Sequence, residues 1–177
     1  MALRVNGVCE ICLKEWAYLF GKTNSFEEFD YFLKMYETKQ IDLFNKDNFY
    51  KVYHQDMLEN FDIYQKSDEN QRKEILEKNY DNIINFFYQE EINLIKKNIL
   101  RTHNIEVFTV FNMSLPPQER EFLYVPLLDL SFLDGTTYSR KYDDNTLYAN
   151  FKKDHSYLGC PRCEAMSVKY INEEYHP

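Results

Sequence analysis

Four cysteines form two pairs, each with two residues between its members. Cys9 and Cys12 make the first pair, and Cys160 and Cys163 make the second. This spacing lets both sulfurs of a pair bind one metal ion while the intervening backbone turns toward it. Two such pairs complete a tetrahedral set of four thiolates, which is the geometry that structural Zn²⁺ prefers. We therefore predict one structural zinc site made of Cys9, Cys12, Cys160 and Cys163.

The two pairs lie far apart in the sequence, with 147 residues between Cys12 and Cys160. A shared ion would join the two ends of the chain, and loop-closure entropy permits this because it grows only logarithmically with loop length. The alternatives are a redox-active dithiol, two disulfides, or an ion shared between two chains. The second pair, with Pro161, resembles the Cys-Pro-x-Cys of zinc-hook dimers, so a homodimer is one of these alternatives.

The four histidines give little evidence of a metal-binding or catalytic role. His155 and His176 are candidates to replace a cysteine at the metal, although we favour their interpretation as surface side chains. His54 has no evident partner. His103 is predicted to lie at a helix end, where its cationic form would suit the helix dipole.

Two groups of residues bear some resemblance to nuclease sites. The first cysteine pair is similar to the opening of zinc-bound HNH nucleases, and the closest local match to their catalytic residues is Asn150, Asp154 and His155. That set is incomplete. Four further acidic residues near predicted strand ends could hold Mg²⁺, but we interpret them as turn residues: Asp129, Asp134, Asp143 and Asp144.

The charge balance favours a protein partner. The chain has 21 basic and 29 acidic residues, a net charge of −8, and residues 1–103 and 104–177 each carry −4. Such a field repels nucleic acids and anionic membranes at long range. The exception is a group of basic residues around the second cysteine pair, which could form a nucleic-acid-binding patch: Lys152, Lys153, Arg162 and Lys169, with Arg140 and Lys141 nearby.

The composition and the sequence argue against several other classes of protein. With only four glycines, all isolated, the chain has no phosphate-binding loop and no dinucleotide fingerprint. The longest uncharged stretch, residues 107–118, is shorter than the roughly 20 residues of a membrane helix. The start of the chain lacks the apolar run of a secretory signal, so we expect an intracellular, reducing location. Abundant Phe, Tyr, Ile, Asn and Lys are typical of an AT-rich genome.

Hydrophobic periodicity predicts an α+β fold. Helices are expected over residues 13–20, 26–38, from about 47 or 48, and 67–101, the last as one helix or two with a break near 89–91. Strands are expected over residues 105–111, 121–133 (interrupted at Pro126), 147–151 and 168–171. We predict a single domain, 1–177, with a mainly helical part (1–103) packed beside a small antiparallel β-rich part (104–177), each carrying one cysteine pair.

These observations favour a non-enzymatic, zinc-stabilised interaction or regulatory protein. With its AT-rich composition it would suit a phage or viral accessory protein that binds and inhibits a host nucleic-acid-processing protein. The first alternative is a nucleic-acid-binding regulator, because the cysteine pairs resemble those of zinc ribbons. The second is an HNH-like or other metal-dependent nuclease.

Overall fold

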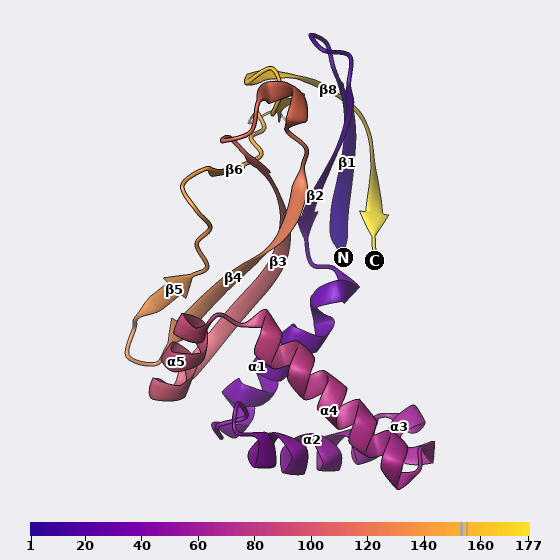
Figure 1. Ribbon diagram of the computed structural model, residues 1–177, viewed down its shortest axis with the longest axis vertical. Helices are drawn as coiled ribbons and strands as arrows, with labels where there is room; N and C mark the ends of the chain where they lie inside the picture. Colours follow the sequence, from indigo (N-terminus) through magenta and orange to yellow (C-terminus); the bar gives the residue numbers. More distant parts are fainter. Residues whose placement is uncertain (153, 155) are drawn as a thin grey trace. The chain divides into compact units, whose positions relative to one another are not determined.

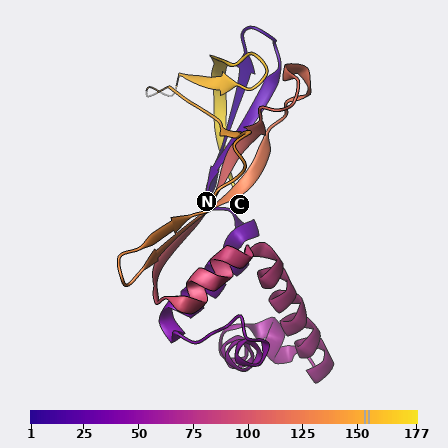
Figure 2. The ribbon, with the colours of Figure 1, turned by 60° about the vertical axis from the view of Figure 1, so that its left-hand side comes forward.

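The computed structural model describes residues 1–152, 154 and 156–177, and it confirms the α+β class (Figures 1 and 2). The chain forms two compact units. Unit 1 contains Met1–Phe26, Asn104–Asp129 and Ser139–Pro177, and unit 2 contains Glu27–His103 and Leu130–Tyr138. The interpretation of residues 1–177 as a single domain stays a prediction.

Antiparallel strands dominate unit 1. In the part of the chain that the structure describes, eight strands hydrogen-bond in the order β5-β4-β3-β2-β1-β8-β7, with β6 beside β3. The first strand therefore lies next to the last, and Ala2 pairs with His176. The strands are β1 (Ala2–Cys9), β2 (Glu15–Gly21), β3 (Leu100–Asn112), β4 (Leu123–Phe132), β5 (Thr137–Ser139), β6 (Thr146–Tyr148), β7 (Tyr157–Cys160) and β8 (Ala165–His176).

The predicted helix over residues 13–20 is wrong, because this segment forms strand β2. Its aromatic residues Trp16, Tyr18 and Phe20 alternate along the strand and pack in or against one buried cluster. That alternation suits a strand whose one face is covered. Gly21 ends β2 with a φ of 95°, a conformation that glycine adopts without strain. The helical part of the chain therefore begins at Glu27.

The other predicted strands are found with different boundaries. The strand predicted over residues 121–133 is the shorter β4, and of the one predicted over residues 147–151 only the first two residues belong to a strand, β6. Strand β3 contains the predicted segment 105–111, and β8 extends the predicted segment 168–171 in both directions. Strand β4 continues through Pro126 instead of stopping there. The Pro126 carbonyl accepts a hydrogen bond from the Tyr142 hydroxyl at 2.5 Å.

Unit 2 contains the helices α1 (Glu27–Lys39), α2 (Lys46–Asn60), α3 (Asp62–Lys66), α4 (Glu69–Phe86) and α5 (Gln89–Lys97). The prediction of a helix over 26–38 is confirmed by α1. Helix α2 begins at Lys46, close to the expected start at about residue 47 or 48, and Asn45 caps it by accepting hydrogen bonds from the N–H groups of Asp47 and Asn48. The segment predicted as helical over 67–101 forms two helices, α4 and α5, and its last two residues already belong to strand β3. Asp68 and Gln71 form a capping box at the start of α4.

The helices of unit 2 enclose an aromatic core. Phe32 is fully buried, and its ring lies within 6.4 Å, centroid to centroid, of the rings of Tyr36, Phe44, Phe49 and Phe87. Aromatic pairs at these separations add to the free energy gained by burying their area. None of the helices in the described residues is long and apolar enough to cross a membrane.

His103 is a second correction. It lies in strand β3 and not at a helix end. Its imidazole is almost completely buried and bonds two carboxylates of α1: Nδ1 lies 2.5 Å from Glu37 Oε1, and Nε2 lies 3.3 Å from Asp30 Oδ1. The side chain therefore ties the start of β3 to α1 within unit 2.

Candidate metal centre

Each cysteine pair occupies the turn of a β-hairpin. Cys9 ends β1 and Cys160 ends β7. The residue after the second cysteine adopts a left-handed conformation in both turns, with φ of 60° at Leu13 and 52° at Glu164. Its N–H donates to the carbonyl of the first cysteine, over 2.9 Å in the first turn and 3.0 Å in the second. The chain thus builds the same turn twice.

The two turns meet because β1 pairs with β8, which places Cys9 opposite Val168. The Cys9 and Cys163 sulfurs lie 3.7 Å apart, and those of Cys12 and Cys160 lie 3.8 Å apart. All four ligand atoms fall within 4.8 Å of one another. A tetrahedral ion with sulfur at about 2.3 Å requires sulfur–sulfur separations of about 3.8 Å.

This geometry gives one candidate metal site within a single chain, as the spacing predicted. All four cysteines are free thiols, so the two-disulfide alternative does not describe this structure. Cys9 and Cys160 are buried, whereas Cys12 is exposed and Cys163 is partly exposed. The site therefore lies at the edge of the core, where an ion has access from solvent.

Hydrogen bonds prepare Cys9 to act as a thiolate ligand. Burial acts to raise the pKa of the Cys9 thiol, but the backbone N–H of Cys12 and the hydroxyl of Ser167 outweigh it and lower the pKa to about 6. The Ser167 Oγ lies 3.1 Å from the sulfur. Burial raises the pKa of the Cys160 and Cys163 thiols. A bound cation would favour the thiolate form of all four.

Arg120 braces the second turn and was missed in the sequence analysis. Its side chain is buried, and its guanidinium donates to the carbonyls of Leu115, Met113 and Pro161 and to the carboxylate of Glu164. These contacts satisfy most of the donors of a buried charge. No local pattern marks Arg120, because the residues that it contacts in the turn follow it by more than 40 positions.

The predicted basic patch is partly neutralised. Arg162 and Lys14 both form ion pairs with Glu121, and the hydrogen bond from Lys14 is the main reason that the pKa of Glu121 is lowered. Both cations also lie over the ring of Trp16, at 5.6 and 4.4 Å from its centroid. Lys152 lies over the Tyr157 ring.

Of the other predicted patch residues, Arg140 is buried, Lys141 and Lys169 are exposed, and Lys153 lies outside the described residues. The prediction of nucleic-acid binding stays a prediction.

The acidic candidates for catalysis hold turns. Asp134, Asp143 and Asp154 each accept a hydrogen bond from the backbone N–H two residues later. Asp129 accepts one from the Ser139 hydroxyl. Among the described residues, none of these four, nor Asp144, belongs to a group close enough to share a metal ion.

Among the described residues, no histidine joins the four cysteines in the candidate metal site. His176 bonds the carbonyl of Pro177, and His54 bonds the hydroxyl of Tyr64. The Asn150 carbonyl accepts from Gly159. His155 lies outside the described residues.

No protein-family model matches the chain, and neither curated proteins nor solved structures give a match. Its function must therefore be argued from the chemistry of its own surfaces.

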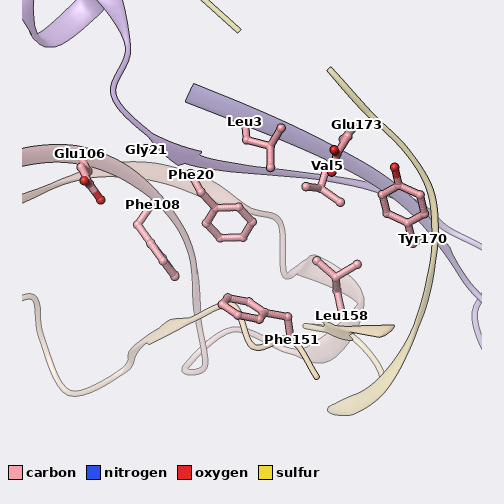
Figure 3. Close-up of a pocket in the computed structure, with 10 residues that line it drawn as sticks. All are labelled: Leu3, Val5, Phe20, Gly21, Glu106, Phe108, Phe151, Leu158, Tyr170 and Glu173. Carbon is pink, nitrogen blue, oxygen red and sulfur yellow. The ribbon is translucent and has the colours of Figure 1, made fainter. Parts of the chain in front are cut away.

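Unit 1 also contains an apolar groove of about 440 Å³ (Figure 3). Figure 3 shows the rings of Phe20, Phe108 and Phe151 on its aromatic side, with the Phe20 ring centroid 4.9 Å from that of Phe108 and 5.9 Å from that of Phe151. Glu106 lies at one end and Glu173 at the other. Neither carboxylate has an ion-pair partner among the described residues. The groove is also lined by Leu3, Val5, Gly21, Leu158 and Tyr170.

Proposed function

We propose that this chain is a non-enzymatic, zinc-stabilised protein that binds a protein partner through the groove of unit 1. The observation that carries the proposal is that unit 1 contains both a set of four cysteine sulfurs that can close around an ion and an apolar groove with a carboxylate at each end. A catalytic zinc keeps a coordination position for water or substrate, whereas four protein thiolates leave none. The metal centre therefore has a structural role, and we propose the groove as the surface that binds the partner.

Zinc is the ion that we propose, because tetrahedral thiolate sites select zinc or iron and zinc is the usual structural choice. Native mass spectrometry of protein purified under reducing conditions tests this directly. We expect one zinc ion on each monomer. A chain without metal, or an ion that bridges two chains, would contradict the proposed intramolecular site.

The groove suits a partner segment that carries an apolar side chain next to a lysine or arginine. Its floor and walls are aromatic and aliphatic, which favours burial of an apolar side chain. Glu106 and Glu173 place negative charge at its two ends. The net charge of −8 would also speed association with a basic protein. A protein that itself binds nucleic acid has such a surface, and occupying it would inhibit that protein.

Selection from a displayed peptide library tests the groove. We expect the selected peptides to place Lys or Arg beside a large apolar residue. Reversing both charges, with Glu106→Lys and Glu173→Lys, should weaken binding by tenfold or more. The matched control is Glu69→Lys with Glu74→Lys, which makes the same net change on helix α4 of unit 2.

Three outcomes would count against the proposal. Equal binding by the groove variant and its control would show that the groove is not the binding surface. Cleavage of nucleic acid that depends on added Mg²⁺ or Mn²⁺, and that is lost in Asp154→Ala, would show an enzyme instead. Salt-dependent binding to nucleic acid that persists in the groove variant would favour the regulator hypothesis.

A further inference from the structure

Strand β8 is paired along one edge but only partly along the other. Its first edge pairs with β1 as far as His176. Its second edge pairs with β7 only over residues 165–169, and one further backbone bond runs from the Tyr170 N–H to the Ser156 carbonyl at 3.5 Å. Among the described residues, no strand pairs with this second edge over residues 171–176, which we call the open stretch of β8. Figure 1 shows this part of β8 at the margin of the sheet.

The open stretch has the properties of a surface to which another strand can bind. An unpaired strand edge presents backbone N–H and C=O groups that a further strand can bond. The open stretch is as long as an ordinary strand, and all its residues are exposed. Two of its large side chains, Ile171 and Tyr175, are 54% and 75% exposed. A strand bound here would therefore bury apolar area as well as bond the backbone.

One face of the open stretch continues the wall of the groove of unit 1. Opposite residues of two antiparallel strands lie on the same face of the sheet. Glu173 lies opposite Val5, and both line the groove. Tyr175 lies opposite Leu3, another residue of the groove. Tyr170, three positions before Glu173, lines the groove as well, because the pairing with β1 shifts by one residue between them. A strand added to the open stretch would direct every second side chain toward this face.

The charges of the open stretch favour a basic strand. Glu173, on the groove face, has no ion-pair partner among the described residues. Glu174, on the opposite face, lies 3.7 Å from Arg4. A lysine or arginine opposite Glu173 would form a cross-strand ion pair, and such pairs stabilise a sheet.

The same charges disfavour a second copy of this chain as the added strand. The midpoint of residues 171–176 falls between Glu173 and Glu174. Antiparallel pairing of two copies along the whole open stretch would therefore place Glu173 of one copy opposite Glu174 of the other. Like charges directly opposite each other destabilise a strand pair.

We propose that an extended, basic segment of the protein partner binds to the open stretch of β8 as an additional strand. Its backbone bonds the open edge, a lysine or arginine lies opposite Glu173, and apolar side chains on the same face enter the groove. In this mode of binding the main chain supplies affinity and alternate side chains supply specificity. The inference rests on the proposed function, because it states how the partner occupies the groove of unit 1.

Backbone N-methylation of a bound peptide tests for the added strand. The starting peptide is one selected by display against the full chain, whose binding is weakened by Glu106→Lys with Glu173→Lys. Each N-methyl group removes one N–H donor, and in an added strand only alternate N–H groups face β8. Methylation at every second position should therefore weaken binding about tenfold or more, while the positions between them should bind as before. A peptide bound as a helix would not show this alternation.

Amide hydrogen exchange, followed by NMR, detects the same pairing from the side of the protein. The peptide should slow the exchange of those amides in residues 171–176 that exchange fast in the free chain. Strand β5, at the other end of the sheet, is the matched control, and its amides should keep their exchange rates.

A charge exchange tests the register. Glu173→Lys should weaken binding of the peptide, and replacing the basic residue of the peptide by glutamate should restore it. Glu174→Lys makes the same change in charge at the next residue, whose side chain lies on the opposite face. The glutamate peptide should not restore binding to this control variant.

Failure of this inference can be distinguished from failure of the proposed function. If no selected peptide depends on the groove, both are wrong. If the peptide depends on the groove, but N-methylation shows no alternation or the amides of residues 171–176 keep their exchange rates, only the added strand is wrong. Protection of these amides that grows with protein concentration in the absence of peptide would show pairing between two copies and would also overturn the inference.

Discussion

Ser167→Ala should weaken metal binding without disturbing the fold. The Ser167 hydroxyl is buried and lies 3.1 Å from the Cys9 sulfur, and its other neighbour is the Ala165 carbonyl at 3.4 Å. In the metal-bound protein the hydroxyl can donate to the Cys9 thiolate, which is then its stronger acceptor. Alanine removes this donor and adds no atom to the core.

The size of the effect follows from the position of Ser167 behind the ligand. Removing a hydrogen bond to a metal ligand typically lowers metal affinity about 10- to 100-fold, which corresponds to about 1.4 to 2.7 kcal/mol. The N–H of Cys12 still points at the Cys9 sulfur, at 3.5 Å, so the loss should not be larger. The metal-free protein should lose only about 0.5 to 1.5 kcal/mol, the net contribution of one hydrogen bond.

Competition with a chromophoric chelator measures the zinc affinity of both proteins. The single tryptophan, Trp16, packs in the buried cluster that contains Cys9 and Cys160, so its fluorescence reports metal loading independently. Ser139→Ala removes an exposed hydroxyl that bonds Asp129 and serves as the control. A Ser167→Ala protein that keeps wild-type affinity, or whose metal-free form loses as much stability as its zinc-bound form, would refute this role.

Four further predictions can be checked by spectroscopy and unfolding. A chelator should change the fluorescence of Trp16 but leave the helical circular dichroism of α1–α5, since the metal centre belongs to unit 1. Arg120→Met should lower the free energy of unfolding, measured with denaturant, by about 2 to 4 kcal/mol, because the backbone carbonyls that Arg120 bonds lose their hydrogen-bond donor. Gly7→Ala should cost about 1 to 3 kcal/mol, since its Cβ would lie 2.6 Å from a neighbouring side chain, and Gly159→Ala, with a nearest contact of 3.4 Å, should cost less. Burial raises the pKa of Glu28 despite its bond to a neighbouring amide and a nearby lysine, so the folded state holds its proton to higher pH than the unfolded state. Stability should therefore fall as pH rises from the ordinary range of a glutamate pKa through the raised value. Glu28→Gln should make that fall smaller; burial also raises the pKa of Asp56, which contributes to the same fall.

The candidate site could be predicted from sequence because its signal is local. Residue type and a spacing of two within each pair specify the ligands, whatever fold surrounds them. Helix α1 was also predictable, since its apolar residues repeat every three or four positions, which fits a helix and not a strand. The segment containing Trp16 was not, because its apolar residues fit both a helical spacing and the alternation of a strand. Pairing with β1, a contact outside the segment, decides between them.

The residues that support the site could not be predicted, because their partners are distant in the sequence. Ser167 reaches Cys9 across 158 positions, and Arg120 reaches Glu164 across 44. His103 likewise meets Glu37 across 66 positions. Each looks like an isolated polar residue until the strands are paired. Periodicity shows which face of an element is buried, but it does not show which elements become neighbours.

The long separation between the cysteine pairs has a structural reason. Strands β1 and β8 pair along their length, from Ala2 opposite His176 to Cys9 opposite Val168, so the sheet itself brings the two turns together. The ion therefore does not have to close the 147-residue loop, and its binding energy adds to a site that strand pairing has already formed. Strand β1 contributes to both the metal centre and the groove of unit 1. Its residue Val5 lines the groove and also belongs to the buried cluster that contains Cys9. Loss of the metal should thus disturb the groove of unit 1 before it disturbs the helices of unit 2.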